Sequence, residues 1–271
     1  ARAAFERLLK LPAGDEVNDA LLGAGVAALE IDLVADFDRV AARLAATSED
    51  HARRLGSALS RPRFLLRGMG GLDRAWLEHF ADVLDAVLDA YDELFAFREW
   101  SKVPGKKLRF RIHLEAAITK PPHFAPQFPF HSEIDFPVLD AKSFTSPSAD
   151  GKFFFYGLCH ELGHVVAMWG DREREEDFHA WAHFTGVVVV EHLAKAGKHK
   201  WLADLKDAKW RSLTLERERL KDSKPSVADR DGVLALLIAL HDRVGTKALG
   251  AAINQLDAEN KRLRVNGVRY Y

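Results

Sequence analysis

The sequence predicts an α+β fold that is predominantly helical, with a small mixed sheet in the middle of the chain. Apolar residues recur every three or four positions through residues 1 to 60, through 73 to 97 and through most of the second half, which is the period of amphipathic helices. Residues 107 to 115 instead alternate apolar and polar side chains, as half-buried strands do. With 48% hydrophobic residues among 271, the chain can bury a substantial core.

The first half is expected to contain helices, then a strand, then a long helix. Residues 1 to 60 are rich in alanine and leucine at helical spacing, and residues 61 to 68 form a short strand candidate. Residues 73 to 97 predict one long amphipathic helix. Its apolar side carries Trp76, Phe80, Val83, Leu84, Val87, Leu88 and Tyr91.

The middle of the chain predicts a small sheet and a proline-rich segment. Leu108, Phe110 and Ile112 alternate with charged residues, which predicts a strand. Residues 121 to 140 are expected to form only loop and edge strand, because proline cannot donate to a central ladder.

The second half is expected to be helical, from the segment that begins near residue 151 to about residue 264. Residues 221 to 231 are polar and contain Pro225, so they are the best candidate for a joint between subdomains. We expect three segments: 1–60 as N-terminal helices, 61–170 as the sheet with the active-site helix, and 171–271 as a helical C-terminal subdomain. The helix that begins near residue 151 is expected to pack on the sheet.

The charge balance argues against a nucleic-acid partner, because 39 basic residues accompany 40 acidic ones. The single cysteine, Cys159, excludes an internal disulfide and a cysteine-rich zinc module. No stretch reaches the roughly 18 consecutive apolar residues of a membrane span, so we expect a soluble protein without a membrane partner. The lone thiol and the absence of an intact secretory signal at the start favour the cytoplasm. The sequence makes no prediction of oligomeric state.

Residues 151 to 171, GKFFFYGLCHELGHVVAMWGD, place two histidines and a glutamate in an apolar and aromatic run. His160 and His164 are four residues apart, so on a helix their imidazoles share one face and can bind one metal ion. Glu161 lies about 100° further around the helix and can reach a metal-bound water as a general base. Polar groups buried without partners are costly, and one Zn²⁺ ion would satisfy all three. The pattern therefore predicts a zinc site.

A zinc hydrolase needs a third protein ligand, because such sites hold the metal with three ligands and leave the fourth position for water. Gly170 and the short turn after it predict a second helix antiparallel to the first. The start of that helix then lies at the height of His164. The possible ligands there are Glu173, Glu175, Glu176, Asp177 and His179. The acidic members also fit an ordinary solvated first turn that the helix dipole stabilises.

HELGH, followed by a helix that reads EEDFHAWAHF, resembles the gluzincin class of zinc metallopeptidases over about 35 residues. The resemblance implies a zincin-like fold, in which the active-site helix packs on the sheet. By analogy with this class, the strand within FPFHSEIDFPV (residues 128 to 138) is an edge on which an extended substrate can pair. Alignment on WAHF places the metal-binding glutamate of the class at Glu175 and a polar residue that supports the ligands at His179. Alignment on the gluzincin aminopeptidases places the ligand at Glu176 instead. His179 as a direct ligand is a third alternative. The oxyanion tyrosine and exopeptidase strand of those aminopeptidases have no counterpart here, so the resemblance does not imply aminopeptidase specificity.

We therefore predict a zinc metallopeptidase that binds one Zn²⁺ ion and hydrolyses a peptide or protein substrate. The expected ligands are His160, His164 and Glu175, with Glu161 as general base. An oxyanion donor or a residue that supports the ligands is expected among His179, His183, Tyr156 and His241. Two alternatives remain open: a catalytically inactive zinc-binding or metal-sensing protein of the same fold, and a helical interaction module without metal.

Overall fold

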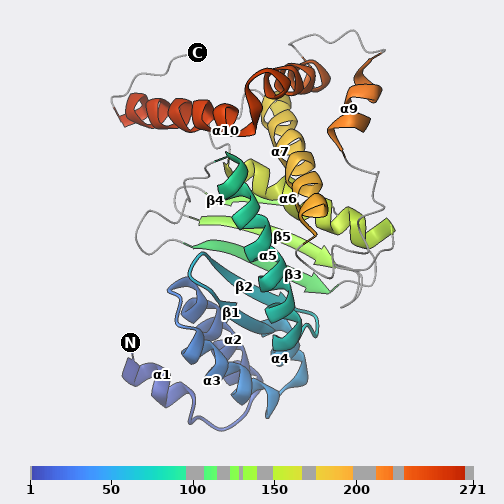
Figure 1. The fold of residues 1–271 in the computed structure, drawn as a ribbon. Helices are drawn as coiled ribbons and strands as arrows, with labels where there is room; N and C mark the ends of the chain where they lie inside the picture. Colours follow the sequence, from blue (N-terminus) through green and yellow to red (C-terminus); the bar gives the residue numbers. More distant parts are fainter. Residues whose placement is uncertain are drawn as a thin grey trace. The chain divides into compact units, whose positions relative to one another are not determined.

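The structure is a computed structural model, and it describes residues 2–95, 107–114, 123–127, 131–138, 149–166, 175–197, 212–221 and 229–265. The chain divides into two compact units. The first comprises residues 1–83 and 105–141, and the second comprises 84–104 and 142–271. This division differs from the three expected segments, because the N-terminal helices share a unit with the sheet and the HELGH helix belongs with the C-terminal helices. The colours of Figure 1 follow the chain through both units.

Four helices open the first unit: α1 (Arg2–Leu8), α2 (Asp15–Glu30), α3 (Val34–Ala45) and α4 (Glu49–Leu55). Helices α2 to α4 enclose an apolar cluster that reaches Ala58 and Leu65 of the sheet. Its fully buried residues include Leu21, Phe37, Val40, Leu44 and Leu55. Each such side chain contributes about 1.5–3 kcal/mol on burial, so this cluster holds the helices on one face of the sheet.

The prediction that helix continues to residue 60 is wrong. Helix α4 ends at Leu55, and Ser57–Ser60 form strand β1. Gly56 is the cause, because its φ of +79° lies in the left-handed region that favours glycine and ends helices. A Cβ at this position would lie 1.9 Å from the carbonyl oxygen of Gly68. The chain therefore leaves the helix and enters the sheet at one residue.

The sheet has five strands: β1 (Ser57–Ser60), β2 (Phe64–Met69), β3 (Leu108–Leu114), β4 (His123–Gln127) and β5 (His131–Val138). Their order is β1-β2-β3-β5-β4, as Figure 1 shows. The sheet is mixed, since β3 is parallel to both neighbours and the outer pairs are antiparallel. The expected strands at 61 to 68 and in the alternating segment are confirmed as β2 and β3. The α+β, predominantly helical fold is confirmed with them.

The prediction that residues 121 to 140 contain no central strand is wrong, because β5 pairs with β3 on one side and with β4 on the other. Pro137 lies opposite His113 of β3 and two residues past Asp135, the last residue of β5 that is paired with β4 in the described part. The edge strand is β4, which carries Pro126. The expectation that the 131 to 138 strand offers an open edge to a substrate is therefore wrong.

Helix α5 (Arg74–Phe95) confirms the long amphipathic helix, and its predicted apolar side is buried. Residues 96 and 97, the end of that prediction, lie outside the described residues. In the first unit, Phe80 packs edge-on against Phe110 and Phe136 of the sheet, with ring centroids 5.9 and 5.7 Å away. In the second unit, the hydroxyl of Tyr91 donates a hydrogen bond of 2.5 Å to the carbonyl of Cys159.

The second unit is helical: α6 (Ala149–Val166), α7 (Glu175–Ala196), α9 (Leu213–Leu220) and α10 (Arg230–Val265). Helix α10 is kinked at Gly245. The expected helices are confirmed where the structure describes them, while the turn at Gly170, most of the 221 to 231 joint and residues 200 to 211 lie outside that part. Within the described residues, no helix has both the length and the apolar character that a membrane span needs.

Helices α6 and α7 run antiparallel and approach closely at two glycines. A Cβ on Gly163 would come within 2.8 Å of the Cα of Ala182, and one on Gly186 within 3.1 Å of the backbone nitrogen of His160. Such distances are tighter than ordinary contacts, so the two glycines set how near the helices lie. They bring the next turns of both helices, which carry histidines, into contact range.

Gly163→Ala should lower the free energy of unfolding by about 1–3 kcal/mol, because the added methyl overpacks this crossing. Gly23→Ala is the matched control: Gly23 lies in α2, and a Cβ there meets nothing within 4 Å. The control should stabilise the protein by roughly 0.5–1 kcal/mol, as alanine does in an open helical position. Chemical denaturation followed by circular dichroism measures both, and a stabilised Gly163→Ala protein would contradict the close crossing.

Candidate metal centre

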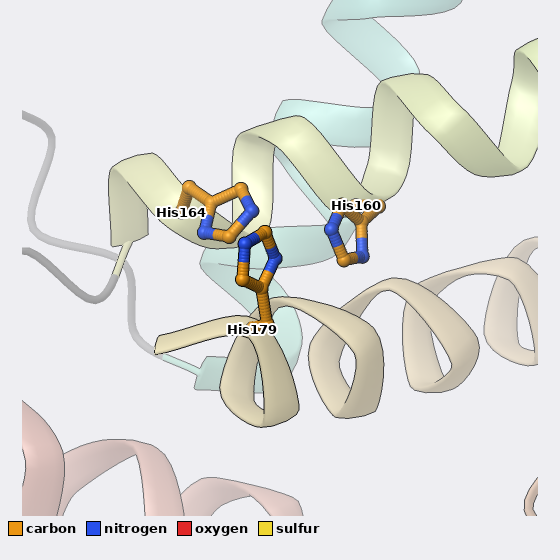
Figure 2. A group of neighbouring side chains, drawn as sticks. All are labelled: His160, His164 and His179. Carbon is orange, nitrogen blue, oxygen red and sulfur yellow. The ribbon is translucent and has the colours of Figure 1, made fainter. Parts of the chain in front are cut away.

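Three imidazoles converge between helices α6 and α7, as Figure 2 shows. His160 and His164 come from successive turns of α6, and their ring centroids are 4.8 Å apart. His179, near the start of α7, lies 4.8 Å from His164 and 5.9 Å from His160, measured between ring centroids. One potential ligand atom from each ring lies within 4.8 Å of the other two. The close approach of the helices thus gathers a ligand set from both.

This set fits a zinc ion. Tetrahedral zinc with Zn–N bonds of about 2.0–2.1 Å places two nitrogens about 3.4 Å apart, so the rings would close by roughly 1 Å or more at the widest pair. Rotations about the side-chain bonds provide such a movement. Imidazole nitrogen is a preferred ligand of zinc, and three protein ligands leave one position for water.

The cluster has a buried side and a side open to solvent. His164 is 3% exposed and Glu161 6%, whereas His160 and His179 are half-buried. Burial, together with the nearby imidazoles of His160 and His179, lowers the pKa of His164 to about 2. His164 is therefore neutral at physiological pH, which is the form that binds metals.

The predicted site residues differ in how far the structure describes them. His160 and His164 lie together, and His179, the third alternative for the remaining ligand, lies with them. Glu175 and Glu176 are the first residues of α7, but their side chains lie outside the described part, so both remain predictions. Glu161 follows His160 in α6 and is buried, as a general base screened from bulk water would be.

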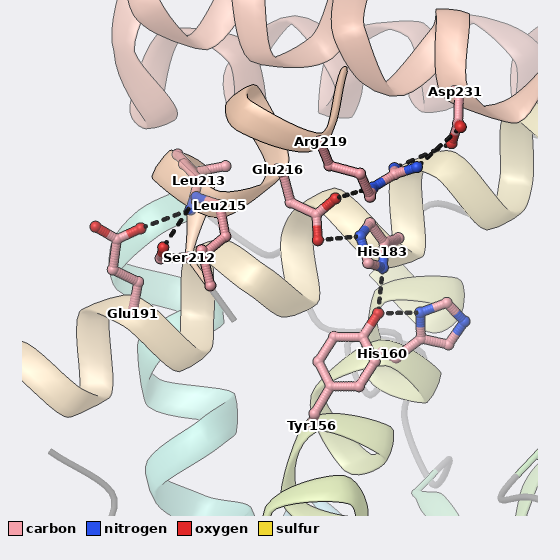
Figure 3. Close-up of polar contacts among 10 residues, drawn as sticks. All are labelled: Tyr156, His160, His183, Glu191, Ser212, Leu213, Leu215, Glu216, Arg219 and Asp231. Carbon is pink, nitrogen blue, oxygen red and sulfur yellow. Dashed lines mark hydrogen bonds and ion pairs between the residues drawn. The ribbon is translucent and has the colours of Figure 1, made fainter. Parts of the chain in front are cut away.

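Tyr156 and His183 form a layer behind His160, shown in Figure 3. The hydroxyl of Tyr156 lies 3.3 Å from Nδ1 of His160 and also forms a hydrogen bond with Nδ1 of His183. Nε2 of His183 lies 3.1 Å from a carboxylate oxygen of Glu216. These contacts fit the predicted role of supporting the ligands better than the role of oxyanion donor.

His241, the remaining predicted candidate, is not a member of the imidazole cluster. It lies on α10, where its ring nitrogens contact the hydroxyl of Thr246 at 3.0 Å and the carboxylate of Asp242 at 3.3 Å. Its ring packs edge-on against Phe184, with centroids 5.7 Å apart. His241 therefore joins α10 to α7.

Glu216 of α9, which was not among the predicted site residues, is buried, with 4% of its surface exposed. Nε of Arg219 donates a hydrogen bond of 2.9 Å to its second carboxylate oxygen. In the sequence, Glu216 lies in the run LERERL, which resembles an ordinary solvated face. Ser212, whose hydroxyl accepts a hydrogen bond from the backbone N–H of Leu215, marks where α9 begins but not which face is buried.

Glu216 should make the stability of the protein depend on pH in the acid range. Burial raises the pKa of its carboxyl, but hydrogen bonds from His183 and Arg219 outweigh burial and lower it to about 2, against 4.5 in an unfolded chain. The ionised carboxylate therefore contributes its full stability above pH 4.5 and loses it as the pH falls toward 2. From pH 5 to pH 3, the stability advantage of the wild type over Glu216→Gln should shrink by roughly 2 kcal/mol. Urea unfolding at each pH measures it, and a constant difference would contradict the assignment.

Comparison with known proteins adds no relative from which a role could be transferred. No family model matches the chain, and no curated protein matches its sequence. The resemblance of HELGH and the following helix to the gluzincin class therefore remains a prediction. The function has to be argued from the residues of the site.

Proposed function

We propose that the protein is a zinc-dependent hydrolase that cleaves peptide bonds, with the metal held by His160, His164 and His179. One observation carries the proposal, the convergence of these three imidazoles beside a buried glutamate. Three nitrogen ligands with an open fourth position are typical of catalytic rather than structural zinc. The resemblance of HELGH to the gluzincin class supports peptides as the substrate class.

The proposed chemistry divides between the ion and Glu161. Zinc, when bound, lowers the pKa of a coordinated water and polarises the substrate carbonyl. Glu161 takes the proton of the attacking water and returns it to the leaving amine. Its burial supports this role, because a carboxylate with little surrounding water interacts more strongly with charge that develops beside it.

The third ligand has two candidates. His179 is supported by its place in the cluster, and Glu175 by the alignment with the gluzincin class. Both residues belong to the first two turns of α7, so either choice takes the third ligand from the same end of the same helix. Glu176 is the corresponding choice under the aminopeptidase alignment.

Hydrolysis of a random peptide library tests the proposal directly. The purified protein should cleave peptides, lose this activity when a chelator removes the metal, and regain it on addition of one equivalent of Zn²⁺. Emission spectroscopy on the same samples should show one zinc per chain. A metal-free protein that cleaves peptides at the same rate, or a protein that binds no zinc, would contradict the proposal.

A catalytically inactive zinc-binding or metal-sensing protein is the second candidate. The observation that favours it is the engagement of Tyr156, His183 and His241 in hydrogen bonds with other protein groups, which leaves no assigned oxyanion donor among these three. In that case the protein binds one zinc per chain, and its rate on the peptide library equals that of Glu161→Gln.

A further inference from the structure

A chain of hydrogen bonds runs behind the imidazole cluster from helix α9 to His160 (Figure 3). It is anchored at Glu216, which binds Arg219, and Arg219 in turn donates two hydrogen bonds of 2.9 and 3.0 Å to Asp231 of α10. Glu216 is ionised at neutral pH, because the groups that donate to it keep its pKa low. An ionised carboxylate can only accept hydrogen bonds, so Glu216 determines which group is the donor in each of the hydrogen bonds that lead to His160.

His183 is the next residue in this chain of hydrogen bonds. Its Nε2 lies 3.1 Å from Glu216 and must donate, so Nε2 carries the hydrogen. When this imidazole is neutral, its other nitrogen accepts, and here that nitrogen, Nδ1, bonds the hydroxyl of Tyr156. The single hydroxyl hydrogen of Tyr156 is therefore directed at His183.

Tyr156 completes the chain at His160. Because its hydrogen is directed at His183, its oxygen can only accept from Nδ1 of His160, 3.3 Å away. His160 then carries its hydrogen on Nδ1 and its lone pair on Nε2. Figure 2 shows one ring nitrogen of His160 directed toward His164 and His179, on the side where the ligand atoms converge.

We propose that Glu216, His183 and Tyr156 are positioning residues that fix this tautomer of His160 and thereby present its Nε2 lone pair to the metal. The inference rests on the proposed zinc site. The opposite tautomer would place an N–H where the ligand atom must be and could not bind a metal. The chain of bonds therefore makes zinc affinity depend on a helix, α9, that has no residue in the imidazole cluster.

The structure offers a matched control for this dependence. The backbone N–H of Leu213, at the start of α9, donates a hydrogen bond of 3.2 Å to the carboxylate of Glu191 on α7. Glu191 thus helps to hold α9 in place as Glu216 does, but it is not part of the chain that reaches His160. Glu191→Leu removes this bond as Glu216→Leu removes the bond to His183, so it separates the attachment of α9 from the fixing of the tautomer.

Competition titration of each purified protein with Zn²⁺ and a chromogenic chelator gives the first test. Tyr156→Phe and Glu216→Leu each break the chain and should weaken zinc binding about 10- to 100-fold, the usual effect of losing a group that orients a ligand. Glu216→Gln keeps an oxygen that accepts from His183 and should restore most of the affinity lost in the leucine variant. Glu191→Leu, which loses the bond to Leu213 but leaves the chain to His160 intact, should bind zinc like the wild type.

The ¹⁵N and ¹H resonances of the His160 ring in the metal-free protein give the second test, because they report which nitrogen carries the hydrogen. The wild type should show hydrogen on Nδ1, and Tyr156→Phe should lose this preference. Hydrogen on Nε2 in the wild type would overturn the proposal. A loss of zinc affinity in Tyr156→Phe accompanied by an equal loss in Glu191→Leu would also overturn it, because the effect would then be a general loosening of the second unit.

The outcomes separate this inference from the proposed function. If Tyr156→Phe binds zinc as tightly as the wild type does, the positioning role is contradicted but the proposed zinc site is not. If the variants show the expected order of zinc affinities but the protein cleaves no peptide, the positioning role is supported and only the proposed hydrolase activity is contradicted. A wild type that binds no zinc contradicts both.

Discussion

Replacing Glu161 by glutamine should lower the rate of peptide hydrolysis by about a hundred- to ten-thousand-fold, the usual contribution of a positioned general base. Glutamine has nearly the same size but cannot take a proton from water. Because Glu161 is not one of the three imidazole ligands, the zinc content should remain one per chain. Initial rates on a peptide library, with metal analysis of the same preparation, measure both quantities.

Glu191→Gln is a suitable control for that experiment, because it makes the same chemical change at a half-buried glutamate of the same unit. It should hydrolyse peptides at the wild-type rate. Equal rates of hydrolysis for the wild type and Glu161→Gln would show that Glu161 is not the general base. Loss of zinc from Glu161→Gln would make Glu161 part of the binding site instead.

His179→Ala should abolish the stabilisation that zinc gives the folded protein. A ligand that binds only the folded state stabilises it by about 2.7 kcal/mol when its free concentration is one hundred times the Kd, so wild-type unfolding should shift by this amount. The variant loses one of three imidazoles, and at the same zinc concentration its unfolding curve should match that of the metal-free protein. Urea unfolding with buffered free Zn²⁺ and with chelator measures the difference.

His192→Ala provides the matched control on the same helix, because His192 lies outside the cluster and pairs with Glu93 at 3.5 Å. It should keep the full stabilisation by zinc. The same assay on Glu175→Ala decides the third ligand. If Glu175→Ala loses the stabilisation and His179→Ala keeps it, the gluzincin alignment is correct and the assignment to His179 is contradicted.

Local patterns were sufficient to predict the elements whose period is long and regular. The apolar side of α5 and the alternation in β3 each come from consecutive residues, and both elements occur where they were expected. The pairing of His160 with His164 belongs to the same category, since residues four apart on a helix share a face whatever surrounds them.

Strand β1 was not predicted and β5 was predicted at the wrong place in the sheet, because single residues had effects that depend on their neighbours. Gly56 was read as an ordinary residue in a helical segment, yet its close approach to Gly68 ends α4 and starts β1. Pro137 was expected to exclude a central strand, but β5 is central, and Pro137 lies two residues past Asp135, its last residue paired with β4 in the described part. Neither contact can be read from the local sequence alone.

The rest of the candidate site depends on helix packing that spacing along the chain does not reveal. The helices α6 and α7 cross closely at Gly163 and Gly186, and this crossing places His179 of α7 beside His164. Glu216 is 52 residues beyond His164 in the sequence and reaches the site only through His183. An acidic residue in a charged run carries no sign of such a contact.

Anomalous diffraction at the zinc absorption edge, from crystals of the zinc-loaded protein, tests the central claim most directly. We expect one peak per chain, within about 2.0–2.1 Å of one nitrogen each from His160, His164 and His179, the usual zinc to imidazole distance. A peak elsewhere in the chain, or crystals grown with zinc that show no peak between these three rings, would contradict the metal centre and the hydrolase built on it.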